Sequence, residues 1–234
     1  MPISRTSIIF VSGAWHTSFH IQPVIPHLEK AGYRIIPCTL PAAGTKGSTY
    51  EENYTAIQNA AEEELALGQN VALILHSAGG ASGCEAVNQL LASPVNTFAD
   101  SIQIIFLASF IAHEHITKRL MEEGHIRFDA GEGVIYHEKP YEGFFNDMDR
   151  EKARPFVEAL TFFQPTQVEF SSDVWQKVPL THVVCERDES VLPETQVALA
   201  EQYGMKVVRL DARHDPFVSQ PEKFVEVVDG ILKG

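Results

Sequence analysis

The segment from Val71 to Gly83, with the sequence VALILHSAGGASG, constrains the fold of this chain more than any other. Its first half is an apolar run typical of a buried strand, and a helix is expected directly after Ser77. A sharp turn between a strand and a helix requires small neighbours, because the two elements approach closely and the residue at the bend is strained. Ala78, Gly79 and Gly80 meet that requirement. We therefore expect the turn to present the Ser77 hydroxyl as a nucleophile, beside the first amides of the helix.

Strands and helices are expected to alternate along most of the chain, because apolar runs of strand length alternate with helical spacing of apolar residues. The strands are expected at Ser7–Ser12, Tyr33–Leu40, Val71–Leu75, Ser101–Ala108, His182–Cys185 and Lys206–Leu210, and the helices at Ile21–Lys30, Tyr50–Leu67, Ala78–Leu91, Pro193–Tyr203 and Pro221–Leu232. Such alternation predicts an α/β fold, with a mostly parallel sheet of about six strands and helices on both faces.

Residues 111–175 interrupt this alternation. They are polar at first and aromatic later, with helical spacing at Thr117–Glu123 and Arg150–Leu160 and a glycine-rich turn at Gly131–Gly133. A structureless loop of this length is uncommon, so we expect a small lid inserted into a core formed by residues 1–110 and 176–234. Ligands of open parallel sheets bind beyond the carboxyl ends of the strands, and the lid is expected to cover that region.

The composition excludes several classes of partner. The formal net charge of −13 disfavours nucleic acids and anionic membranes, which attract positive surfaces. No apolar run is long enough to span a bilayer, and no signal-peptide pattern is found. Cys38, Cys84 and Cys185 are too widely spaced for a disulfide framework or a zinc site. We expect a cytoplasmic monomer or homodimer without a metal or an organic cofactor.

A serine nucleophile requires a base and a carboxylate that orients the base. Among the ten histidines, His214 follows the last expected strand, where a loop can carry it back over the sheet; the alternative is a solvent-exposed loop histidine. Asp188 follows the preceding strand, and the order Ser77, Asp188, His214 is the one found in strand–turn–helix hydrolytic sites. Asp211 and Asp215 are alternatives for the acid, but so close to His214 a carboxylate is more often a turn former or a solvated charge.

The oxyanion formed by attack on a carbonyl requires amide donors, each worth about 10²–10³ in rate. One is expected to be the amide of Ala78, directly after Ser77. The other is expected from the loop FVSGAWH after the first strand, where Gly13 permits a tight turn and Ala14 offers its N–H. Taken alone, Gly13 would be an ordinary turn glycine.

Aromatic residues of the lid favour a small apolar or aromatic substrate, although most are expected to pack the lid itself and only about two to face the pocket. These residues are Phe144, Phe145, Phe156, Phe162, Phe163 and Trp175. The candidate pocket residues are Gly13, Trp15, Phe144, Phe145 and Trp175. The sequence HEH at 113–115 lacks the spacing of an HExxH zinc site and is expected to be solvated.

Together these motifs resemble the α/β-hydrolases, and within them a group of plant methyl esterases and hydroxynitrile lyases with bacterial and fungal relatives. The resemblance covers nearly the whole chain, in SGAWH, LHSAGG, FFNDM, VWQKVPLTHVVCERDESVLPETQ and ARHDPFVSQPE. It implies the α/β-hydrolase fold with Ser77 as nucleophile, Asp188 as acid and His214 as base. It also implies an oxyanion hole formed by the amides of Ala14 and Ala78.

Three features depart from the pattern of that group. Leu75 stands where the turn usually has glycine, which leaves the tightness of the turn open. Ser12 stands where relatives carry histidine, which predicts altered loop packing or a hydroxyl near the pocket. The lyases carry Thr and Lys where this chain has Gly13 and Asp215, and Asp215 would repel cyanide. The expected function is therefore hydrolysis of a small carboxylic ester through an acyl-enzyme.

Two other functions remain open. The same pocket would serve a lactonase, or an isomerase or cyclase of a secondary metabolite in which the triad acts only as acid and base. The second is a protein that binds a small ligand and turns it over slowly.

Overall fold

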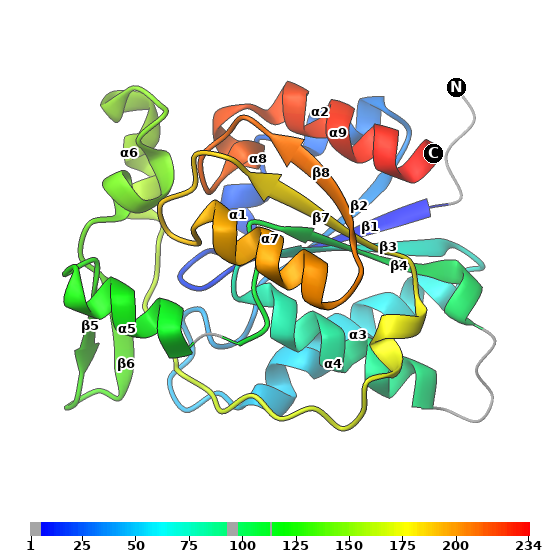
Figure 1. The fold of residues 1–234 in the computed structure, drawn as a ribbon, viewed down its shortest axis with the longest axis horizontal. Helices are drawn as coiled ribbons and strands as arrows, with labels where there is room; N and C mark the ends of the chain where they lie inside the picture. The colour runs from blue at the N-terminus through cyan, green and yellow to red at the C-terminus, as the bar shows by residue number, and fades with distance from the viewer. Residues whose placement is uncertain (1–5, 93–97, 113) are drawn as a thin grey trace.

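The computed structural model describes residues 6–92, 98–112 and 114–234. The strands of its main sheet are β1 (Thr6–Val11), β2 (Arg34–Cys38), β3 (Asn70–His76), β4 (Ile102–Leu107), β7 (Leu180–Cys185) and β8 (Lys206–Leu210). Within the described residues these six strands are all parallel and follow the order β2-β1-β3-β4-β7-β8 (Figure 1). The prediction of a mostly parallel sheet of about six strands is confirmed.

Helices cover both faces of this sheet (Figure 1). One face packs against α1 (Ser18–Ile21), α2 (Ile25–Lys30), α8 (Pro216–Ser219) and α9 (Pro221–Lys233). The other packs against α3 (Tyr50–Ala66), α4 (Gly79–Ala92) and α7 (Pro193–Gln202), while the 3₁₀ turn η1 (Phe98–Ser101) leads into β4. In the part of the chain that the structure describes, no helix is long and apolar enough to cross a membrane.

Local sequence explains where several helices begin. The Thr49 side chain accepts a hydrogen bond from the Glu52 amide at 3.1 Å, and the Glu52 carboxylate accepts one from the Thr49 amide at 2.8 Å, so a capping box starts α3. The helix expected at Ile21–Lys30 is instead two short helices, α1 and α2. Pro23 lies between them and lacks an amide hydrogen, so a continuous helix would lose a hydrogen bond there.

The hydrophobic core has one layer on each face of the sheet. Alternate residues of β1 enter opposite layers, with Ile8 and Phe10 on the α9 side and Ile9 and Val11 on the α3 side. All four side chains are fully buried. Because helices cover both faces, the strands are continuous apolar runs rather than alternating ones. The three cysteines are buried and unpaired within these layers.

Most of the segment between β4 and β7 lies beyond the carboxyl ends of the strands, whereas its last part runs back along the α3 and α4 side of the sheet to the start of β7 (Figure 1). It contains α5 (Glu114–Glu122), the antiparallel pair β5 (Ile126–Asp129) and β6 (Val134–His137), the π-helical turn η2 (Tyr141–Phe145), α6 (Arg150–Glu158) and the 3₁₀ turn η3 (Val174–Lys177). The two helices were expected, whereas the β5–β6 pair and η2 were not. Buried side chains of the segment, including Ile116, Leu120 and Phe144, join the core layer of the α9 side.

A buried histidine in β7 makes the fold sensitive to acid. His182 is fully buried and stacks on Phe106, with ring centroids 5.8 Å apart. Neither of its ring nitrogens has a hydrogen-bond partner among the described residues, and burial lowers its pKa to about 3. The unfolded chain takes up this proton below an ordinary pKa of about 6.5, whereas the folded protein excludes it. The stabilisation is therefore complete above that pH and is lost as the pH falls toward about 3.

We expect His182→Leu to reduce the drop in melting temperature between about pH 7 and about pH 5, because one excluded proton costs about 1.4 kcal/mol per pH unit in this window. His115→Leu is the matched control, since His115 is exposed in α5. Thermal unfolding that is equally acid-sensitive in wild type and His182→Leu would contradict this role of His182.

Candidate active site

Ser77 lies in the bend between β3 and α4, with a φ of 51°. Residues other than glycine rarely adopt positive φ, so the bend is strained. Two hydrogen bonds hold it: the Ser77 amide donates to Leu107 O at 3.1 Å, and Ser109 Oγ donates to Ser77 O at 2.7 Å. Trp15 and Ala108 are the other non-glycine residues with positive φ in the described chain, at 65° and 47°. Backbone strain is thus concentrated after the carboxyl ends of β1, β3 and β4.

Two glycines allow the backbone to close around Ser77. A Cβ added to Gly13 would lie 2.7 Å from Ser77 Cβ, and one added to Gly80 would lie 2.2 Å from Phe110 O. Both distances are well inside van der Waals contact. The loop after β1 therefore lies against Ser77, and the first turn of α4 lies against the loop after β4, only because these positions lack side chains.

The structure brings His214 and Asp188 together. His214 Nδ1 lies 2.8 Å from Asp188 Oδ2, and the two side chains are almost completely buried. Asp188 Oδ1 accepts hydrogen bonds from the amides of Ser190 and Val191 at 2.8 and 3.0 Å, and Gln196 Nε2 donates to Oδ2 at 3.0 Å. A carboxylate held this way accepts the Nδ1 proton of His214, which leaves Nε2 free to accept another. Gln196 was not identified from the sequence.

The charges around His214 favour its protonated form. Burial opposes that form, but the negative charge of Asp188, its hydrogen bond to the ring and the charge of Asp215 together outweigh burial and raise the pKa of His214 above its ordinary value. The histidine is thus a stronger base than a free imidazole.

The other two candidate acids lie elsewhere. Asp211 is exposed and pairs with Arg187. Asp215 is fully buried, but it pairs with His16 and does not line the cavity that contains Ser77. The expectation that Asp215 is a turn former or a solvated charge is therefore wrong, because its neighbour His16 comes from a distant loop.

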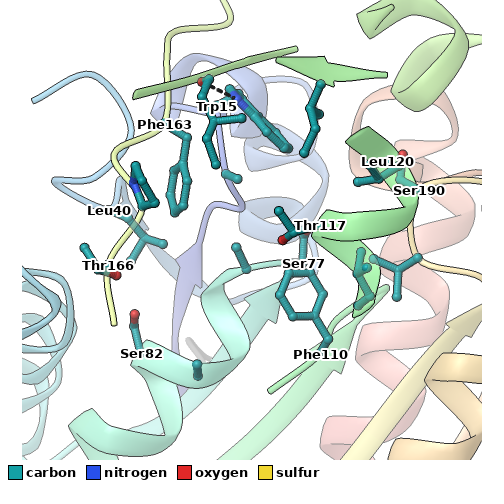
Figure 2. A pocket seen from close by; sticks show the side chains of 18 of the residues that line it. Trp15, Leu40, Ser77, Ser82, Phe110, Thr117, Leu120, Phe163, Thr166 and Ser190 are labelled. Atoms are coloured by element: carbon teal, nitrogen blue, oxygen red, sulfur yellow. Dashed lines mark hydrogen bonds between the residues drawn. The ribbon is translucent and has the colours of Figure 1, made fainter. Parts of the chain in front are cut away.

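Ser77 and His214 line one cavity with a volume of about 120 Å³. In Figure 2, Trp15 and Phe163 lie across this cavity from Phe110, while Leu120 and Thr117 of α5 form another wall. Most of its lining is apolar, with further contributions from Leu40, Ile116, Ile126, Ile135, Val168 and Val191. Such a cavity suits a small apolar or aromatic group.

Two candidate pocket residues line the cavity and the others do not. Trp15 and Phe144 are part of its wall. Gly13 instead lies against Ser77 Cβ, where it makes room for the nucleophile. The Trp15 indole N–H donates to Ile135 O at 2.9 Å, which fixes the ring against β6.

The expectation that Trp175 and Phe145 line the pocket is wrong. Trp175 lies in η3, where its amide donates to Asn88 Oδ1 of α4 at 3.0 Å and its ring packs against Phe106 in the core. Phe145 is fully buried and stacks on His20, with ring centroids 6.3 Å apart. Trp175 belongs to a segment anchored on α4, whereas Phe145 follows the cavity-lining Phe144 but packs against His20 instead.

Ala14 and Ala78 line the same cavity as Ser77. Neither of their amides donates a hydrogen bond to another described residue. Ser12, in the same loop as Ala14, donates its hydroxyl to His16 O at 3.0 Å and so braces the loop rather than the cavity. Both amides are therefore available as hydrogen-bond donors at the cavity.

His76, His214 and Asp215 are the group of possible metal ligands in the described chain, with donor atoms within 4.8 Å of one another. A cation there would compete with existing bonds, since His214 Nδ1 contacts Asp188 and Asp215 Oδ2 contacts His16. The residues fit charge pairing better than metal binding. In the HEH sequence, His113 lies outside the described residues, and Glu114 and His115 are exposed.

Comparison with known proteins agrees with this geometry. The model of the alpha/beta hydrolase family matches residues 8–227. The chain belongs to this family. A curated relative, the probable hydrolase R7 of Phoma sp., is 24% identical over 245 residues, which cover 97% of this chain and 98% of the relative.

Two solved structures share the fold of this alpha/beta hydrolase. A pyrethroid hydrolase from Sphingobium faniae has a TM-score of 0.77 at 19% identity, with 98% of each chain covered. A methylesterase from Arabidopsis has a TM-score of 0.76 at 18% identity, covering 97% of this chain and 99% of its own. The resemblance to plant methyl esterases and their fungal relatives is confirmed at the level of fold and family.

A glycine in α4 compensates for the unusual leucine of this alpha/beta hydrolase. Leu75 is fully buried under α4, and a Cβ added to Gly83 would lie 2.3 Å from Leu75 Cδ2. The leucine therefore occupies the space that a side chain at position 83 would need. The bulk of Leu75 is thus accommodated beneath α4, while Ser77 keeps its positive φ.

We expect Gly83→Ala to destabilise the alpha/beta hydrolase by about 1–3 kcal/mol, because it overpacks Leu75. Leu75→Ala alone should cost about 2–5 kcal/mol, because it leaves a cavity. In the Leu75→Ala background Gly83→Ala should cost much less, since the three leucine atoms that it meets are gone. Urea unfolding of the four proteins measures this coupling, and additive costs would contradict it.

Proposed function

We propose that this alpha/beta hydrolase is a serine esterase that cleaves the carboxylic ester of a small apolar or aromatic molecule through an acyl-enzyme. One observation carries the proposal. Ser77, on a strained turn, shares an apolar cavity with His214, whose Nδ1 contacts the buried Asp188 at 2.8 Å. These are the groups that nucleophilic acyl transfer requires, in one place.

The proposed reaction has two halves. His214 Nε2 takes the proton of Ser77 as Oγ attacks the ester carbonyl, and the resulting oxyanion accepts hydrogen bonds from the amides of Ala14 and Ala78. The C–O bond to the alcohol then breaks, and His214 returns the proton to the leaving oxygen. Water, deprotonated by His214, attacks the acyl-enzyme; the bond between the acyl carbon and Ser77 Oγ then breaks, His214 returns the proton to Oγ, and the acid leaves. Asp188 holds the ring and stabilises its charge throughout.

The cavity supports a small substrate. The cavity has a volume of about 120 Å³, and its wall is mainly apolar. The names of the two similar structures, a pyrethroid hydrolase and a methylesterase, agree with ester chemistry. We infer that residues 111–175 serve as the lid, since α5 and the chain around Phe163 supply much of the wall. A lactone would be opened by the same steps.

We expect Ser77→Ala to lower kcat for a short-chain p-nitrophenyl ester by about 10⁴-fold or more, because the nucleophile is lost. The matched control is Ser101→Ala, which lies before β4 at the opposite end of the sheet and should keep full activity. The measurement is release of p-nitrophenol by the purified proteins.

Other outcomes would overturn the proposal. Unchanged turnover in Ser77→Ala would exclude the serine mechanism. Binding of a small ligand without turnover of any ester would favour a binding protein, and a product with unchanged mass would favour an isomerase or cyclase.

The pH profile tests the role of His214. The base must be neutral to accept the Ser77 proton, so kcat/KM should fall as the pH drops through the pKa of His214. Because that pKa is raised, the midpoint should lie above about 6.5. Asp188→Asn should lower both the midpoint and the rate, the latter by up to about 10⁴-fold. A midpoint below about 6 in the wild type would contradict this assignment.

A further inference from the structure

A second buried histidine–aspartate pair lies behind the catalytic groups. His16 Nε2 lies 2.8 Å from Asp215 Oδ2, and His16 Nδ1 lies 2.7 Å from Ala14 O. The side chains are 1% and 0% exposed. Both ring nitrogens of His16 therefore face acceptors, and both contacts are hydrogen bonds only when the ring carries two protons.

Asp215 supplies the negative charge that matches a doubly protonated His16. Burial alone would raise the pKa of Asp215. The charge and the hydrogen bond of His16, together with the facing ring of His76, outweigh burial and hold this pKa well below its ordinary value. Burial lowers the pKa of His76 to about 3, so that ring stays neutral. The charged partner of Asp215 is thus His16, and the two form an ion pair closed to solvent.

Asp215 contacts all three loops of the proposed machinery. It follows His214 in the chain, it binds His16 in the loop after β1, and its Oδ1 lies 3.2 Å from Nε2 of His76. That last contact is close but lacks the alignment of a hydrogen bond. His76 directly precedes Ser77, and its ring lies 4.7 Å from that of His214. One carboxylate therefore ties together the loops that carry the nucleophile, the base and an oxyanion donor.

His16 fixes the backbone on both sides of Ala14. Its amide donates to Gly13 O at 3.3 Å, and this carbonyl belongs to the same peptide group as the Ala14 N–H. Its ring nitrogen Nδ1 contacts Ala14 O, which belongs to the next peptide group. Both peptide planes that flank Ala14 are held from residue 16, so the direction of the Ala14 N–H depends on where Asp215 holds the His16 ring.

We propose that His16 and Asp215 are a positioning pair that aims the Ala14 amide at the oxyanion formed beside Ser77. The inference rests on the proposed esterase function. Neither residue lines the cavity, so both act through Ala14 and the loop rather than by contact with the substrate. Hydrogen bonds to the developing oxyanion are sensitive to small displacements of their donors, which gives a remote pair a direct effect on rate.

The experiment compares Asp215→Asn, His16→Gln and the double variant. Each single variant should lower kcat for a short p-nitrophenyl ester by about 10- to 100-fold, while KM changes by less than about threefold. The affinity for an aryl boronic acid, which forms a tetrahedral adduct at Ser77, should fall in parallel with kcat. The double variant should be no slower than the slower single variant, because both substitutions disrupt the same pair.

Asp211→Asn is the matched control, because Asp211 lies in the same loop but is exposed, and it should retain wild-type kcat. Full kcat in Asp215→Asn would overturn the pair's role. Multiplicative losses in the double variant would also overturn it, as would losses that appear only in KM.

A second measurement, of the protonation of the His16 ring by NMR, uses the wild-type protein and does not depend on enzymatic activity. In wild-type protein at about pH 7, ¹⁵N chemical shifts should show two protonated nitrogens in the ring of His16, and only one in the ring of His76. A neutral His16 at this pH would overturn the ion pair even if the variants fail to fold. Wild-type protein that cleaves no ester would contradict the proposed function instead, and the NMR result would still decide the pair.

Discussion

The strained backbone at Ser77 is the constraint around which the rest of the site is arranged. A positive φ at a residue with a side chain is retained only when its surroundings hold it there. Here Gly13 allows the loop after β1 to lie against Ser77, Gly80 allows α4 to approach the loop after β4, and the Ser77 amide donates to Leu107 O of the neighbouring strand. The unusual Leu75 is tolerated because Gly83 vacates the space that it fills. The glycines around the site therefore lie where side chains would prevent the packing of β3, α4 and the loops next to Ser77.

The site contains two buried carboxylates, and each contacts a different histidine. Asp188 accepts hydrogen bonds from the amides of Ser190 and Val191 and faces His214, which we propose gains and loses the proton during catalysis. Asp215 faces His16, whose ring contacts an acceptor on each side. A charge buried without a partner would be costly, and each of these acids has its own imidazole. We propose that the pair of Asp188 and His214 takes part in proton transfer and that the pair of Asp215 and His16 positions the Ala14 amide.

Local sequence patterns were sufficient to predict the sheet, and they singled out Ser77, His214 and Asp188; the structure places Ser77 and His214 in one cavity and His214 in contact with Asp188. Buried parallel strands are continuous apolar runs. Residues that directly follow such runs lie at the carboxyl edge of the sheet, so their place in the fold can be predicted from the sequence. Long-range contacts could not be obtained in this way. Three such contacts depend on segments that are separated in the sequence. They are the pairing of His16 with Asp215, the hydrogen bond from Gln196 to Asp188, and the packing of Trp175 in the core beside α4. The four-residue strands β5 and β6 were too short to give a periodic signal.

The central claim is that Ser77 is a nucleophile activated by His214, and covalent labelling tests it without knowledge of the substrate. The purified protein would be treated with a fluorophosphonate and digested, and the modified peptide identified by mass spectrometry. The account predicts a single adduct on Ser77, absent in Ser77→Ala and formed far more slowly in His214→Ala, since the base that activates the hydroxyl is then missing. An unmodified protein, or an adduct at another residue that persists in Ser77→Ala, would contradict it.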